Sequence, residues 1–128
     1  MNFQILRGKP HVEELFEELE KKFFNNLMSL EERKRFKRLL KTFELLSNDP
    51  FHNSLHSHEI ISLSEKYGIK VFESYVENNT PRAMRIFWSY GPDKNQITLT
   101  AIELHPDKNK YTQVNLSVKT LKKSGKKE

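Results

Sequence analysis

Side chains that can transfer protons or bind phosphate are concentrated between residues 52 and 111 of this chain. The histidines among them titrate near neutrality and suit general acid or base catalysis. The arginines present a fork of N–H donors that fits a phosphate. On a small basic chain, this combination favours chemistry on RNA over the chemistry of small metabolites. The residues concerned are His52, His56, His58, Arg82, Arg85, His105, Asp107 and Tyr111.

The chain has 128 residues, a formal net charge of +5 and no cysteine. This length predicts one domain with a modest core, residues 1–118, followed by a basic tail over residues 119–128 that we expect to be disordered. The charge favours partners such as RNA, DNA or an acidic protein, although a solvated basic surface explains it equally well. Without cysteine, disulfide and thiolate chemistry are excluded. No apolar run has the length of a membrane span and no signal-peptide pattern is found, so we expect a cytoplasmic protein.

The first half of the sequence has the periodicity of helices. Apolar residues recur at three- and four-residue steps over residues 10–26 and again over residues 29–47, which predicts two helices. Ser29 and Glu32 have the spacing of a capping box at the start of the second helix. The outer face of the first helix is acidic and that of the second is basic. Because the link between them is short, the sequence predicts an antiparallel helical hairpin.

The second half changes to the alternation that is typical of β-strands. The strands predicted from it are residues 71–76, 82–90 and 96–104. Gly91, Pro92 and Asp93 predict a turn, so these strands should form an antiparallel meander, and residues 2–7 should add an edge strand. The alternation breaks after Ala101, which indicates a bulge or burial on both faces. The expected fold is α+β: a helical hairpin packed on one face of a small antiparallel sheet, with the other face open.

Arg85 has a special place in this expected sheet. The apolar residues that alternate with it are Met84, Ile86 and Trp88. If these pack under the helices, Arg85 must point toward the open face. An arginine there suits a bidentate grip on a phosphate. The alternative is a surface ion pair with Glu73 or Glu103 on a neighbouring strand.

Three segments carry a resemblance to a known family. They are the loop Asn53-Ser54-Leu55-His56-Ser57-His58-Glu59-Ile60, the strand Arg85-Ile86-Phe87-Trp88, and the end Ile102-Glu103-Leu104-His105-Pro106-Asp107 with Tyr111. In their order and spacing these segments resemble the RelE/ParE toxin superfamily. The resemblance covers residues 40–111, and the two N-terminal helices in outline. Pro106 and the Glu103-Leu104 lead-in depart from the family pattern.

The resemblance implies the toxin of a type II toxin–antitoxin system, inhibited by a cognate acidic antitoxin. It implies an mRNA endoribonuclease, acting on free RNA or on the ribosome, that uses the 2′-hydroxyl of its substrate as the nucleophile and needs no metal or other cofactor. The catalytic residues that it implies are His105 as acid or base, Arg85 for the phosphate, Asp107 and Tyr111. The expected RNA-binding residues are Arg82, His56, His58, Lys66 and Lys70.

Other functions stay open at this point. A ParE-like toxin of the same fold would bind a protein target without cleaving RNA, and a binding module would keep the fold without activity. The proton-transfer residues favour the nuclease, because a poison of a protein target has no use for them. His52, His56 and His58 also have a spacing that allows zinc, although a loop offers no clear ligand geometry. The oligomeric state does not follow from the sequence.

Overall fold

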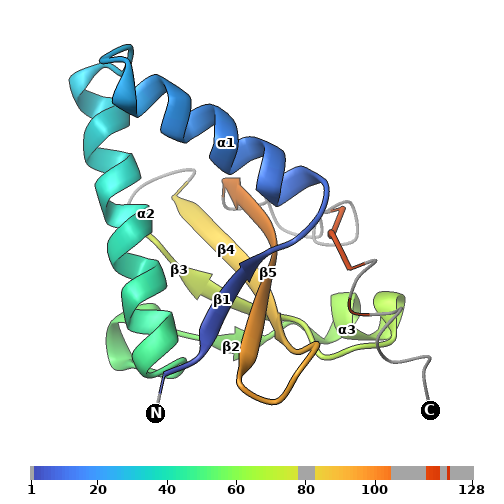
Figure 1. Ribbon diagram of the computed structural model, residues 1–128. Helices are drawn as coiled ribbons and strands as arrows, with labels where there is room; N and C mark the ends of the chain where they lie inside the picture. Colours follow the sequence, from blue (N-terminus) through green and yellow to red (C-terminus); the bar gives the residue numbers. More distant parts are fainter. Residues whose placement is uncertain (1, 78–82, 105–114, 119–120, 122–128) are drawn as a thin grey trace.

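The computed structural model describes residues 2–77, 83–104, 115–118 and 121, and Figure 1 shows their arrangement. The helices and strands are, in chain order, β1 (Gln4–Arg7), α1 (His11–Phe24), α2 (Leu30–Asn48), the 3₁₀ turn η1 (Asn53–Leu55), β2 (His58–Glu59), α3 (Ile61–Tyr67), β3 (Phe72–Tyr75), β4 (Met84–Tyr90) and β5 (Gln96–Leu104). The predicted α+β class is confirmed. None of the helices in these ranges is long and apolar enough to cross a membrane.

The strands form one five-stranded sheet in the order β1-β5-β4-β3-β2. β3, β4 and β5 are the predicted antiparallel meander. β1 is the predicted edge strand, and it pairs in parallel with β5. β2 forms the opposite edge beside β3. The sequence did not predict β2, because a strand of 2 residues is too short to show an alternation.

α1 and α2 form the predicted helical hairpin (Figure 1). The capping box at the start of α2 is present: Ser29 Oγ accepts from the Glu32 N–H at 3.1 Å, and Glu32 Oε1 accepts from the Ser29 N–H at 2.9 Å. The hairpin buries its apolar side against the first face of the sheet. The buried residues of this core are Val12, Phe16, Met28, Phe36, Leu39, Leu46, Leu55, Val76, Ile86, Trp88, Ile97 and Leu99.

The side chains of β4 point as the alternation predicted. Ile86 and Trp88 are fully buried in the first-face core, and Met84 packs against it while partly exposed. The indole N–H of Trp88 donates to Ser74 Oγ at 2.8 Å, so the one polar atom of this side chain is satisfied. Arg85 lies on the second face, as predicted.

The second face of the sheet is covered, and the prediction of an open face is wrong. A second apolar core lies on it, made of Ile60, Leu63, Val71, Phe87, Ala101, Leu116 and Val118. Its cover comes from α3 and from residues 115–118. α3 was not predicted, because a helix of 7 residues with one buried side chain, Leu63, gives no periodic signal. Residues 115–118 are separate in sequence from the strands they cover, so local periodicity cannot predict that they pack on the sheet.

The register of β4 and β5 shifts by one residue. Phe87 lies opposite Ala101, whereas Trp88 lies opposite Leu99, so Thr100 is an extra residue. The predicted break in alternation is therefore a bulge. Because of the bulge, Ala101 packs in the second core with Phe87, whereas Leu99 packs in the first-face core, although regular alternation would put Leu99 and Ala101 on one face. Of the predicted tail, residues 119–128, only Leu121 is described, and it is 7% exposed.

Candidate functional site

Polar side chains gather on the second face, at the end of β3 and the start of β4. We call this group the Arg85 cluster; its members are His56, His58, Glu73, Tyr75, Arg85 and Glu103. Cross-strand register explains why they meet: His58 pairs with Glu73, Tyr75 with Arg85, and Arg85 with Glu103. Alternate residues of a strand share a face, so Glu73 and Tyr75 lie side by side. His56 joins them from the loop before β2, with its ring 5.0 Å from that of Tyr75.

Arg85 has the predicted direction but not the predicted exposure. The side chain is only 6% exposed. Its Nη1 donates to the Glu77 carbonyl at 2.7 Å and makes a longer contact of 3.4 Å with the Met84 carbonyl. The guanidinium carbon lies 3.5 Å from the centroid of the Tyr75 ring, a cation–π arrangement. These contacts fix the plane of the guanidinium.

The charge of Arg85 is not neutralised by the described part of the chain. There the guanidinium forms no ion pair, and its buried Nε has no hydrogen-bond partner. Glu103, one of the two expected ion-pair partners, lies directly opposite Arg85 on β5, yet its exposed side chain forms no ion pair with the guanidinium. A buried cation without a carboxylate is costly and is suited to an anionic ligand.

Glu73, the other expected partner of Arg85, is paired with His58 instead. His58 Nε2 lies 3.1 Å from Glu73 Oε1, and the Glu73 side chain is 1% exposed against 46% for His58. The Nδ1 of His58 lies 2.8 Å from the carbonyl oxygen of His56 and must donate to it, because a carbonyl only accepts. Both ring nitrogens of His58 are therefore occupied. This residue holds the loop and strand β2 onto β3.

His56 presents an exposed imidazole that is not tied to a carboxylate of the described residues. Its backbone adopts the left-handed conformation, with φ of 50°, at the end of η1. The side chain is exposed, and its ring makes no hydrogen bond with the residues that the structure describes. The His56 ring packs against Tyr75, and the Arg85 guanidinium lies over the same tyrosine ring. The structure therefore brings two predicted site residues, His56 and Arg85, into contact with one aromatic side chain.

The two predicted lysines lie elsewhere. Lys66 is on α3, with its ammonium 5.3 Å from the centroid of the Tyr67 ring. Lys70 is exposed and precedes β3, whereas Tyr75, which contacts Arg85, ends that strand. Lys66 is thus placed on the helix that covers the apolar core of the second face, and Lys70 at the opposite end of β3 from Tyr75. The other predicted site residues, Arg82, His105, Asp107 and Tyr111, lie outside the described residues.

The histidine spacing does not assemble a metal site in the described ranges. There, histidine and acidic side chains do not form a group of three that could hold a metal. His52 Nδ1 instead accepts from the Ser54 N–H at 3.1 Å and caps η1. The zinc alternative for His52, His56 and His58 thus gains no support from their positions.

One cavity of the described residues is separate from the Arg85 cluster. It has a volume of about 430 Å³ and lies between β1 and the start of α1, where Arg7 and Glu13 contribute to its wall. The charge of Arg7 is already met by Glu20, 2.9 Å away.

One member of the cluster, Tyr75, and one contact of Arg85, Glu77, were missed in the sequence, whereas Glu73 and Glu103 were named only as ion-pair partners of Arg85. Tyr75 and Glu73 share the predicted parity of the second face, but the register that places Tyr75 against Arg85 depends on the connection between β3 and β4. Glu77 lies in that connection, where periodicity gives no signal.

No model of a protein family, no curated protein and no solved structure matches this chain.

Proposed function

We propose that this protein is the toxin of a type II toxin–antitoxin system and cleaves mRNA as a metal-independent endoribonuclease. The observation that carries the proposal is Arg85. Its buried guanidinium has no carboxylate partner among the described residues and is held over Tyr75, whose ring also packs against the exposed imidazole of His56. The order of a helical hairpin and an antiparallel meander also agrees with the resemblance to the RelE/ParE superfamily.

The proposed reaction is a transesterification within the RNA. The 2′-oxygen attacks the adjacent phosphorus, the bond from phosphorus to the 5′-oxygen breaks, and the products are a 2′,3′-cyclic phosphate and a 5′-hydroxyl. A base takes the proton of the 2′-hydroxyl, and an acid gives a proton to the leaving oxygen. These transfers need side chains only.

Each proposed residue has a role in this reaction. Arg85 binds the non-bridging oxygens, where negative charge grows in the transition state. His105 is the proposed acid or base, supported by Asp107 and Tyr111. His56 contacts the RNA near Tyr75. An acidic antitoxin would bind this basic chain in the cytoplasm and inhibit it by covering the phosphate-binding site.

The test is cleavage of a labelled mRNA by the purified chain, with and without ribosomes, in the presence of EDTA. We expect cleavage to persist in the chelator and the upstream product to end in a 2′,3′-cyclic phosphate. We also expect unpartnered expression to block translation and slow growth. Intact mRNA together with normal translation would contradict the proposal and favour a protein-binding toxin or an inactive module. Chelator-sensitive cleavage that leaves 5′-phosphate ends would indicate a metal mechanism instead.

A further inference from the structure

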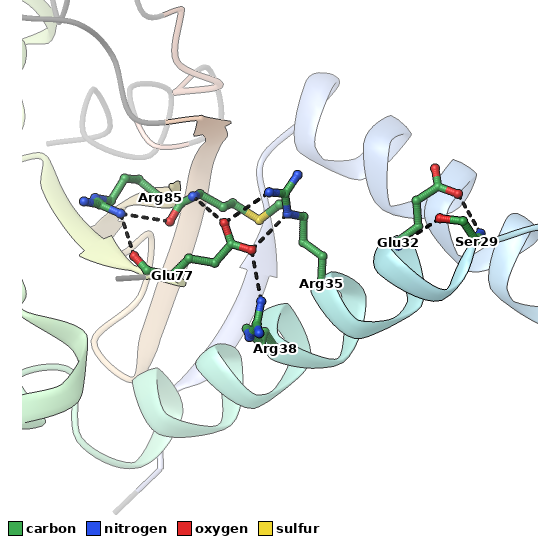
Figure 2. A network of polar contacts seen from close by, with 7 residues as sticks. Ser29, Glu32, Arg35, Arg38, Glu77 and Arg85 are labelled. Carbon is green, nitrogen blue, oxygen red and sulfur yellow. Dashed lines mark hydrogen bonds and ion pairs between the residues drawn. The ribbon is translucent and has the colours of Figure 1, made fainter. Parts of the chain in front are cut away.

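Glu77, which follows β3, is a buried carboxylate bound from two elements (Figure 2). Its Oε2 accepts from Arg35 Nε at 3.0 Å and from Arg38 Nη1 at 3.2 Å. Its Oε1 accepts from Arg35 Nη2 at 3.3 Å and from the Met84 backbone N–H at 3.0 Å. The Glu77 side chain is 7% exposed. Helix α2 is therefore joined to the start of β4 through one carboxylate.

The backbone of the same residue holds Arg85. The carbonyl oxygen of Glu77 accepts from Arg85 Nη1 at 2.7 Å, the shortest contact of this guanidinium. In Figure 2, Arg35 and Arg38 approach the carboxylate of Glu77 from α2, and Arg85 reaches its carbonyl from the other side. A side chain fixed by four hydrogen bonds restricts the rotation of its own backbone. The direction of the Glu77 carbonyl, and with it the guanidinium, is restricted in turn.

The Glu77 carboxylate keeps its charge in this environment. Burial alone would raise its pKa, but hydrogen bonds from Arg35 and the Met84 N–H, together with the charges of Arg35 and Arg38, lower the pKa below its usual value. Near neutral pH the network is therefore complete. The arginines themselves are half-exposed, at 47% for Arg35 and 58% for Arg38, so Glu77 is the one buried member of the ion-pair network.

We propose that Glu77 is a positioning residue for Arg85, and that the arginines of α2 act through it to hold the guanidinium in place over Tyr75. The effect of Glu77 on catalysis rests on the proposed function, whereas its hydrogen bonds to Arg35, Arg38 and Arg85 are observed in the structure. The guanidinium of an arginine is planar and rigid. If the hydrogen bond of its Nη1 is lost, the whole group can rotate, and all its other N–H groups move with it. A misplacement of about 1 Å in a catalytic group can cost on the order of 10²-fold in rate.

The test compares Glu77→Gln with Glu20→Gln. Glutamine keeps the volume of Glu77 but turns an amide N–H₂ toward the arginines, which breaks the network. Glu20 is the matched control, because it binds Arg7 through two contacts of 2.9 and 3.4 Å that are not linked to Arg85. Both variants are first checked for folding by thermal unfolding. If Glu77→Gln does not fold, Arg38→Gln takes its place, since Arg38 is largely exposed.

The first measurement is the NMR signal of the Arg85 Nε–H, identified by its absence in Arg85→Lys. It does not depend on activity. We expect Glu77→Gln to shift or broaden this signal and Glu20→Gln to leave it unchanged. An unchanged signal in folded Glu77→Gln would overturn the inference, whether or not the protein cleaves RNA.

The second measurement is the rate of mRNA cleavage at varied mRNA concentration in a cell-free translation reaction. A positioning role lowers kcat by about 10-fold or more while KM is unchanged, because the loss is confined to the transition state. An equal rise in KM at constant kcat would contradict positioning and indicate that the network only binds RNA. If wild-type protein fails to cleave, the proposed function fails, and the NMR result still decides the role of Glu77.

Discussion

The two faces of the sheet are buried in different ways. On the first face, the hairpin of α1 and α2 covers aliphatic and aromatic side chains, and the polar atom of Trp88 has its partner in Ser74. On the second face, an apolar core under α3 gives way to the Arg85 cluster, where a cation and a carboxylate are buried. The first face is suited to stability. The second holds charged groups at a cost in stability, which is typical of functional sites.

The largest effect is expected at His105, the proposed acid or base. Replacing a positioned acid or base lowers the rate by about 10²–10⁴-fold. We therefore expect His105→Ala to lose mRNA cleavage by such a factor while its denaturation midpoint stays near that of the wild type. Wild-type cleavage by this variant would show that the family histidine was assigned to the wrong position and would make His56 the next residue to test.

On the first face we expect a loss of stability. In free energy it is similar in size to the loss of transition-state stabilisation at His105. Trp88 is fully buried, and Trp→Ala changes in cores cost about 3–5 kcal/mol. Trp88→Ala should therefore lower the free energy of unfolding by about this amount, measured by urea denaturation. Leu40→Ala is the control, because Leu40 on α2 is 44% exposed and should change stability little. Equal effects of the two substitutions would contradict the placement of Trp88 in the core.

The two faces also differ in how much of their structure the sequence predicted. Helical and alternating periodicity predicted α1, α2 and the meander, and they predicted that Trp88 and Arg85 point to opposite faces. Periodicity could not predict the burial of Arg85, because alternation gives the face to which a side chain points but not what covers that face. Nor could it predict Tyr75 or Glu77 as contacts of Arg85, because these depend on strand register and on the connection between β3 and β4.

A smaller effect, on acid stability, is expected where α2 meets β4. Because the pKa of Glu77 is lowered in the folded protein, its contribution to stability is present above the unfolded value of about 4.5 and is lost as the pH falls through the folded pKa. Glu77→Gln should therefore be less stable than the wild type at neutral pH, and the difference should shrink on acidification below about pH 4.5. Urea denaturation over this pH range measures it. A difference that is constant with pH would contradict the assigned ionisation.

The smallest effect is expected at His56. Its ring packs against Tyr75 and is exposed, so it can contact RNA at the margin of the site. His56→Ala should reduce cleavage less than His105→Ala does, mainly by raising KM, and should leave the fold intact. A loss of kcat equal to that of His105→Ala would move His56 into the proton-transfer machinery.

Arg85 is the residue whose surroundings carry the proposed function, and its substitution tests that proposal directly. The measurement is the mRNA cleavage rate of Arg85→Ala and Arg85→Lys, with thermal unfolding of both variants as the check on folding. We expect Arg85→Ala to lose on the order of 10²–10³-fold in rate, as for removal of one donor to the transition state. Arg85→Lys should recover little of this, because an ammonium lacks the planar fork. Wild-type cleavage by folded Arg85→Ala would contradict the assignment of Arg85 as the phosphate-binding cation.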